Sequence, residues 1–193
     1  MKIRTEPTPI PGVVIVAPEA FEDARGFFFE VYREDEAAAQ GLPDRIVQVN
    51  HSRSARGVLR GLHFQWAPPV GKLMRVLHGT AYLVAVDLRK DSPTLGKWFG
   101  RIFTAEDKKQ LWAPASFARG FCALSDGVEI EYLTTGIYNP ATETGIRWDD
   151  HAIGIAWPVK KPVLSDRDRS AQTLAEWLAR PESDHFKVEP SAS

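Results

Sequence analysis

The chain has 193 residues, a length that suits one compact domain able to bury a sizeable core. Its 24 Lys and Arg residues nearly balance its 25 Asp and Glu residues, which excludes a global electrostatic attraction for nucleic acid or for an anionic membrane surface. Cys122 is the only cysteine and no apolar run approaches the ~20 residues of a membrane span, so we expect a cytoplasmic protein without intrachain disulfides and without nucleic-acid or membrane partners.

Short strand-like runs separated by turn signals follow one another along the chain. In chain order they cover residues 13–17, 27–32, 46–52, 58–65, 72–78, 80–88, 96–103, 110–113, 118–124, 128–135 and 144–148. Gly79 separates two of these runs, and Asp126-Gly127 lies between two others as a hairpin signal. Many short strands at this spacing predict an all-β sandwich, jelly roll or barrel rather than alternating strands and helices.

Helical signals are few. Residues 35–40 predict a short helical turn, and Ser170 is placed to cap a C-terminal helix that ends at Arg180-Pro181. One face of that helix carries Ala171, Leu174, Trp177 and Leu178. We expect residues 1–193 to form a single domain in which 181–193 are an extended tail.

The segment 57–65, Gly-Val-Leu-Arg-Gly-Leu-His-Phe-Gln, is followed closely by Lys72. It places an imidazole, a guanidinium and an amine together, and such groups can remove a proton from carbon beside a carbonyl on a phosphorylated substrate. His63 suits the role of base near neutral pH. Alternatively, His63 is an ordinary packed or surface histidine without a catalytic role. Asp166 or Asp168 could supply the acceptor that orients the ring.

His63 and Arg60 have opposite parity along their predicted strand. Both side chains can serve one pocket only if the strand is distorted between them. Gly61 is the natural position for such a bulge.

Two tyrosines, Tyr132 and Tyr138, flank a Thr-Thr-Gly turn. A phenol can deliver a proton to the opposite face of a carbanion, although most strand tyrosines only bury a ring and hydrogen-bond at its tip. Arg25 could reach phosphate or could be an ordinary turn arginine. Because the sequence has no dinucleotide-binding glycine motif, no P-loop and no close histidine pair, we expect no cofactor and no metal site.

An ordered set of motifs spans about residues 12–168. It comprises Asp23-x-Arg25-Gly26-x-Phe28-x-Glu30, Gln48-Val49-Asn50-His51-Ser52, the 57–65 segment, Gly71-Lys72-Leu73, Val86-Asp87-Leu88-Arg89, Ser92-Pro93-Thr94-Leu95-Gly96, Leu111-Trp112-Ala113-Pro114, Phe117-Ala118-x-Gly120-Phe121, Tyr132, Tyr138 and Leu164-Ser165-x-x-Asp168. This set resembles the dTDP-4-dehydrorhamnose 3,5-epimerases, cofactor-independent nucleotide-sugar epimerases of the cupin superfamily. The resemblance implies an all-β cupin jelly roll with a few short helices. It also implies a homodimer that exchanges N-terminal strands, and a nucleoside-diphosphate 4-keto-6-deoxysugar as substrate.

The resemblance also implies roles for individual residues. His63 would be the base, Asp168 its orienting partner, Tyr132 the acid on the other sugar face and Lys72 the group that stabilises the enolate oxygen. The implied substrate-binding residues hold the diphosphate or the nucleoside, with Arg25 acting across the dimer: Arg25, Arg60, Glu30, Gln48, Asn50 and Tyr138.

Two positions depart from the family pattern. Arg119 stands where the family usually has histidine, and Leu83 stands where it usually has aspartate. Arg119 could bind phosphate or a sugar oxygen through its fork of donors, and its charge would favour a neutral His63. The departures leave open whether the pocket has merely repacked or whether substrate or regiochemistry has changed.

We therefore predict an epimerase acting at C5, C3 or both, with conversion of dTDP-4-dehydro-6-deoxy-D-glucose to dTDP-4-dehydro-L-rhamnose as the default. A cupin isomerase that moves the keto group between C4 and C3 is the nearest enzymatic alternative. A non-catalytic nucleotide-sugar binding protein is the alternative from another class, and a metal-dependent oxygenase is more distant still.

Overall fold

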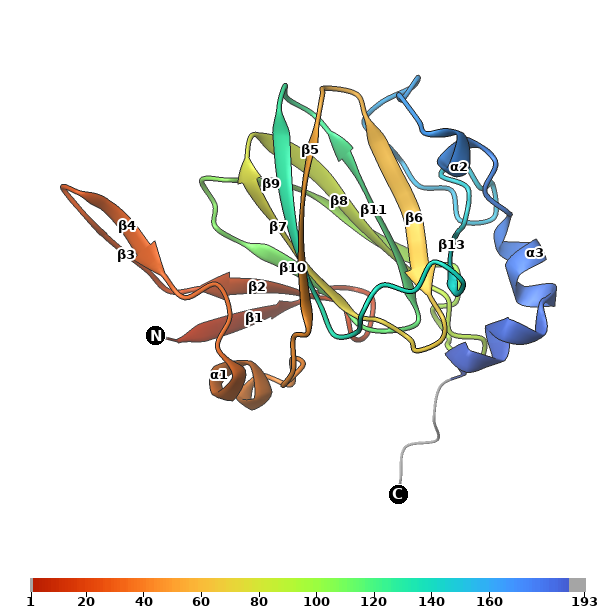
Figure 1. The fold of residues 1–193 in the computed structure, drawn as a ribbon, viewed down its shortest axis with the longest axis horizontal. Helices are drawn as coiled ribbons and strands as arrows, with labels where there is room; N and C mark the ends of the chain where they lie inside the picture. The colour runs from red at the N-terminus through yellow and green to blue at the C-terminus, as the bar shows by residue number, and fades with distance from the viewer. Residues whose placement is uncertain (1, 188–193) are drawn as a thin grey trace.

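The computed structural model describes residues 2–187, and two facing sheets dominate it (Figure 1). The first sheet has the strand order β1-β2-β10-β7-β12-β5, with bounds β1 (Ile3–Pro7), β2 (Val14–Pro18), β10 (Gln110–Ala113), β7 (Lys72–His78), β12 (Val128–Thr134) and β5 (Gln48–Ser54). The second has the order β13-β6-β11-β8-β9, with bounds β13 (Glu143–Gly145), β6 (Leu59–Gln65), β11 (Phe117–Ala123), β8 (Thr80–Asp87) and β9 (Trp98–Thr104). The predicted all-β cupin jelly roll is confirmed.

Alternation along the strands decides which side chains fill the space between the sheets. On β8, Ala81, Leu83 and Ala85 join the buried cluster shared by both sheets. Val84 and Val86 belong instead to a second cluster on the outer side of the same sheet. Alternation along the strand therefore separates the interior of the barrel from its outer face.

Short helical segments cover that outer face: α2 (Asp166–Arg169), α3 (Leu174–Ala179) and η1 (Pro181–Phe186) (Figure 1). Thr173 caps α3, whereas Ser170, the predicted cap, follows the end of α2. The predicted tail is wrong for 181–186, because Phe186 packs on the core and draws this segment into a 3₁₀ turn. Residues 188–193 lie outside the described part of the chain. No helix within 2–187 has the length and apolar character needed to cross a membrane.

Each predicted run overlaps an observed strand, and the short helix α1 (Glu34–Ala39) falls where a helical turn was expected. The strands β1 and β3 (Ala20–Asp23) were missed, because their sequences carry few apolar residues. The predicted hairpin at Asp126-Gly127 is wrong. β11 pairs with β6 and β8, whereas β12 pairs with β5 and β7, so this turn carries the chain from one sheet to the other. Turn residues favour a local reversal, but packing decides the pairing.

The expected bulge interrupts β6. Arg119 of β11 pairs with His63, and Phe121 pairs with Arg60, so two residues of β6 lie opposite one of β11. Gly61, inside the bulge, has a φ of 130°, and a Cβ there would lie 2.6 Å from the backbone of Gly120. The distortion turns Arg60 and His63 toward the same side of the sheet.

A hairpin of β3 and β4 (Gly26–Phe29) projects away from the barrel (Figure 1). Its side chains Phe21, Phe27 and Phe28 are 56%, 61% and 68% exposed. So much exposed aromatic surface on a two-stranded ribbon is typical of an interaction surface.

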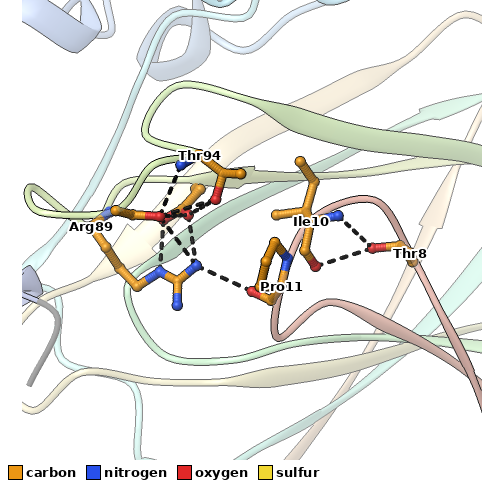
Figure 2. Close-up of polar contacts among 7 residues, drawn as sticks. Thr8, Ile10, Pro11, Arg89 and Thr94 are labelled. Carbon is orange, nitrogen blue, oxygen red and sulfur yellow. Dashed lines mark hydrogen bonds and ion pairs between the residues drawn. The ribbon is translucent and has the colours of Figure 1, made fainter. Parts of the chain in front are cut away.

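Arg89, just after the end of β8, ties the barrel to the N-terminal segment at Pro11 (Figure 2). Asp87 accepts hydrogen bonds from Arg89 Nη2, Ser92 Oγ and Thr94 Oγ1, each at 2.7 Å. The same Arg89 nitrogen donates to the carbonyl of Pro11 at 3.1 Å. Burial alone would raise the pKa of the Asp87 carboxyl, but these hydrogen bonds outweigh it and hold the pKa below its usual range.

Candidate active site

A cavity of about 360 Å³ lies between the sheets. Eight residues predicted for the site line it: Gln48, Asn50, Arg60, His63, Lys72, Arg119, Tyr132 and Tyr138. Most of them lie on β5, β7 and β12 of the first sheet and on β6 and β11 of the second. Residues distant in sequence meet here because the inward faces of both sheets border the same space.

His63 lies on the second sheet, and its Nε2 is 2.5 Å from Oδ1 of Asp168. Ser165 Oγ donates to the other carboxylate oxygen at 2.7 Å. Burial alone would raise the pKa of Asp168, but the hydrogen bond and charge of His63, with the Ser165 donor, hold the pKa below its usual value. Asp166, the other acceptor considered, is fully exposed. Asp168 is therefore placed to orient the imidazole.

Tyr132 lines the cavity from β12, in the sheet opposite His63. Its hydroxyl lies 2.8 Å from Ser52 Oγ. Burial raises the pKa of this phenol, while the Ser52 hydrogen bond and the positive charge of Arg60 act in the opposite direction. The phenol is protonated at neutral pH and can donate its proton to a group in the cavity.

Lys72 begins β7 and is half-buried. Burial, and next the positive charge of Arg119, lowers the pKa of its ammonium to about 8, while Glu143 acts in the opposite direction. Lys72 is therefore mostly charged at neutral pH and can stabilise a negatively charged oxygen. It loses that charge only slightly above neutrality.

Arg119 uses its donors on the protein itself. Nη1 donates to the carbonyls of Val70 and Phe117, both at 2.9 Å, and Nη2 donates to Val70 at 2.5 Å. The guanidinium donors that we expected to hold phosphate therefore bind backbone carbonyls just before β7 and at the start of β11. Burial lowers the pKa of this guanidinium, while Glu143 opposes the shift. Leu83, the other departure, is fully buried opposite Phe121.

The mouth of the cavity is polar. Gln48 Nε2 donates to Asn50 Oδ1 at 2.8 Å, and Gln48 Oε1 accepts from the backbone N–H of Tyr138 at 2.9 Å. Tyr138 is half exposed, so its ring offers a flat surface beside these amides. Arg60, turned inward by the bulge, is held by Nε donation to Ser54 Oγ at 3.1 Å.

Arg25 and Glu30 do not line this cavity in the described chain. Arg25 lies on the projecting hairpin, where its side chain is 90% exposed and pairs with Asp23. Glu30 follows β4 and accepts from Arg33 Nη1 at 3.2 Å.

The sequence analysis missed four lining side chains: Ser52, Met74, Phe121 and Glu143. Ser52 shares strand parity with Gln48 and Asn50, which could have identified it. No sequence signal distinguished Glu143 within its Thr-Glu-Thr context. Among residues 2–187, no three His, Cys, Asp or Glu side chains gather in a way that could hold a metal ion.

The fold and the cavity define a cupin-type barrel with acid–base side chains on facing inner walls. Residues 7–176 match the family described as dTDP-4-dehydrorhamnose 3,5-epimerase. The chain belongs to this family, whose members are isomerases.

Individual relatives agree over nearly the whole chain. The dTDP-4-dehydrorhamnose 3,5-epimerase of Shigella flexneri is 48% identical over 90% of this chain and 96% of its own length. A dTDP-4-dehydrorhamnose 3-epimerase of Streptomyces niveus is 41% identical, covering 90% of this chain and 85% of its own. The crystal structure of dTDP-6-deoxy-D-glucose-3,5-epimerase from Legionella pneumophila, in complex with dTDP-4-keto-L-rhamnose, is 38% identical with a TM-score of 0.90, covering 98% and 100% of the two chains.

Proposed function

We propose that this protein epimerises C3 and C5 of dTDP-4-dehydro-6-deoxy-D-glucose, giving dTDP-4-dehydro-L-rhamnose in the cytoplasm. One observation carries the proposal: an imidazole with a buried carboxylate partner lines the cavity from one sheet, and a protonated phenol lines it from the other. The family membership supports the same reaction.

In the proposed mechanism, the 4-keto group acidifies the hydrogens on the two flanking carbons. His63 removes one of them, and the electron pair passes to the ketone oxygen, where the Lys72 ammonium stabilises the enolate. Tyr132 then protonates the same carbon from the opposite side, and the ketone reforms with that carbon inverted. Solvent returns a proton to Tyr132 and removes one from His63. A placed acid or base contributes roughly 10²–10⁴ in rate.

The substrate-binding roles follow the layout of the cavity. Arg60 would hold the diphosphate, while Gln48, Asn50 and Tyr138 would contact the nucleoside at the polar mouth. Amide groups suit the edge of a base, and a half-exposed phenol ring suits its face.

A homodimer would complete the site with Arg25 and Glu30 of a second copy. The exposed phenylalanines of the projecting hairpin support this arrangement. Mixed dimers test it: Arg25→Ala and His63→Ala subunits, each inactive alone, should regain activity when mixed, because one site of the mixed dimer has both residues intact. If mixing restores nothing, Arg25 does not act across the dimer.

Inversion of C3 alone is the second candidate. The similarity to a 3-epimerase at 41% identity and the unusual pair of Leu83 and Arg119 favour considering it. The two reactions differ in which carbons change configuration, so one product analysis separates them.

The test is incubation with dTDP-4-dehydro-6-deoxy-D-glucose in heavy water, followed by NMR at each sugar carbon. We expect deuterium at C3 and C5 with the ketone left at C4. His63→Ala should abolish exchange at both carbons. Movement of the keto group to C3 would show a ketoisomerase, and tight binding without exchange would show a binding protein. Wild-type exchange by His63→Ala would contradict the proposal.

A further inference from the structure

Glu143 is the only carboxylate among the described residues that line the cavity. It lies on β13, and its side chain is only 11% exposed. Three cations surround it: its charge acts on Lys72 and on Arg119, and its Oε2 lies 2.8 Å from Nη1 of Arg167. A carboxylate in this setting interacts strongly with its neighbours, because little water screens it.

Arg167 immediately precedes Asp168 on α2. Burial alone would lower the pKa of Arg167, but hydrogen bonds to Glu143 and Tyr138 outweigh it and raise that pKa. The ion pair therefore connects the strand β13 with the single helical turn that carries the partner of His63.

α2 has little apolar packing of its own. Of its four residues, all described, only Asp168 is buried. A second cavity, of about 270 Å³, lies against the helix and is lined by His63, Asp168 and Arg167. Backbone bonds anchor the chain on either side, at Val163 and at Gln172. Between these anchors, polar contacts hold the helix, among them hydrogen bonds to Asp168 from the backbone N–H of Gly61 and from Ser165 and the Arg167–Glu143 ion pair.

We propose that Glu143 is a positioning residue of the site: by binding Arg167 it fixes α2 against β13 and keeps Asp168 directed at His63. The catalytic consequence rests on the proposed function. The loss of this contact lets α2 move over the adjacent cavity, and a displacement of about 1 Å at a catalytic group can cost about 10²-fold in rate.

The test compares Glu143→Gln, Arg167→Gln and the double variant, with Arg169→Gln as the matched control. Arg169 lies on the same helix, is mostly exposed and is 3.9 Å from its acidic partner Asp166. We expect each single variant to lower kcat about 10²-fold. The double variant should be no worse than either single variant, because both remove the same contact. A raised KM is expected for Arg167→Gln alone, because Arg167 also bonds Tyr138.

The split between kcat and KM separates positioning from substrate binding. A positioning role lowers kcat in both single variants, whereas Glu143→Gln keeps KM near the wild-type value. Arg169→Gln should change neither constant.

A kcat close to wild type in either single variant, or a raised KM in Glu143→Gln, would overturn the proposal. A separate readout does not depend on turnover: the low-field proton resonance of the His63–Asp168 hydrogen bond in the ligand-free protein. It should vanish in both single variants and persist in Arg169→Gln, and its persistence in either single variant contradicts the inference. If the wild type turns over no sugar, the proposed function fails, and this resonance still decides whether Glu143 positions Asp168.

Discussion

Two buried aspartates occupy very different regions of this protein. Asp87, at the end of β8, receives donors only from residues within seven positions of it in the chain. Asp168, on α2, has its main partner 105 positions away in β6. Both carboxyls have a pKa below the usual value in spite of burial, because hydrogen bonds outweigh desolvation.

The difference lies in what surrounds each carboxylate. Asp87 is closed off by a guanidinium, two hydroxyls and the Phe117 ring that lies under Arg89. The partner of Asp168 is an imidazole, a group that can accept or donate a proton, and it borders two cavities. A low pKa alone therefore does not distinguish the two carboxylates; the position of the Asp168 partner beside open space does.

The largest expected effect is the loss of kcat when Asp168, the aspartate that contacts His63, is changed. Asp168→Asn should lower kcat by about 10³–10⁴-fold, because the amide can no longer hold the imidazole in the right tautomer or stabilise its protonated form. The melting temperature should change little. Steady-state kinetics and circular dichroism on the same preparation provide the measurement, and a kcat near wild type would show that Asp168 is only structural.

Asp87→Asn should have the converse effect. Removing one partner of a buried ion pair leaves Arg89 without its counter-charge, at a cost of about 3 kcal/mol in the free energy of unfolding. kcat per folded molecule should be unchanged. Asp149→Asn is the control, because its ion pair with Arg147 is exposed and should contribute almost nothing. Urea unfolding measures all three proteins; an unchanged unfolding free energy in Asp87→Asn would contradict the structural role.

The pH dependence of Asp87 has a defined sign. Because its folded pKa is lowered, the stability it contributes is present above the unfolded pKa, near ~4, and is lost as pH falls through the folded pKa. Asp87→Asn should therefore flatten the acid side of the stability profile, which melting curves between pH 2 and pH 6 would show. If Asp87→Asn loses stability just as steeply as pH falls, other groups cause that loss.

A smaller effect is expected at Lys72. Since its pKa is about 8, its charge is present below that pH and lost above it, so kcat should fall as pH rises through about 8. Arg119→Gln removes a neighbouring cation and should move this basic limb to higher pH. Arg101→Gln, at a partly exposed arginine of β9, should leave the limb unmoved. If the basic limb of the kcat profile stays at the same pH in Arg119→Gln, the Lys72 ammonium does not determine that limb.

Local sequence patterns predicted those features that depend on local chemistry. Apolar runs and turn signals located the strands, and the requirement that Arg60 and His63 share a pocket predicted the bulge at Gly61. Pairing between sheets was not predictable in this way, since the turn at Asp126-Gly127 is compatible with either a hairpin or a crossing.

Much of the site was predictable only through the family resemblance. The sequence alone could not choose between Asp166 and Asp168, because the choice depends on how α2 docks against β6. Glu143 was missed because an acidic residue in a polar segment normally faces solvent. Its importance arises only when the fold encloses it with cations.

The account depends most on His63 and Tyr132 acting from opposite walls of one cavity. The most direct test is Tyr132→Phe, with exchange and inversion at C3 and C5 measured separately by NMR in heavy water. The account predicts that deuterium still enters these carbons through His63, while inversion falls far more than exchange does. Equal loss of exchange and inversion, or inversion at the wild-type rate, would contradict it.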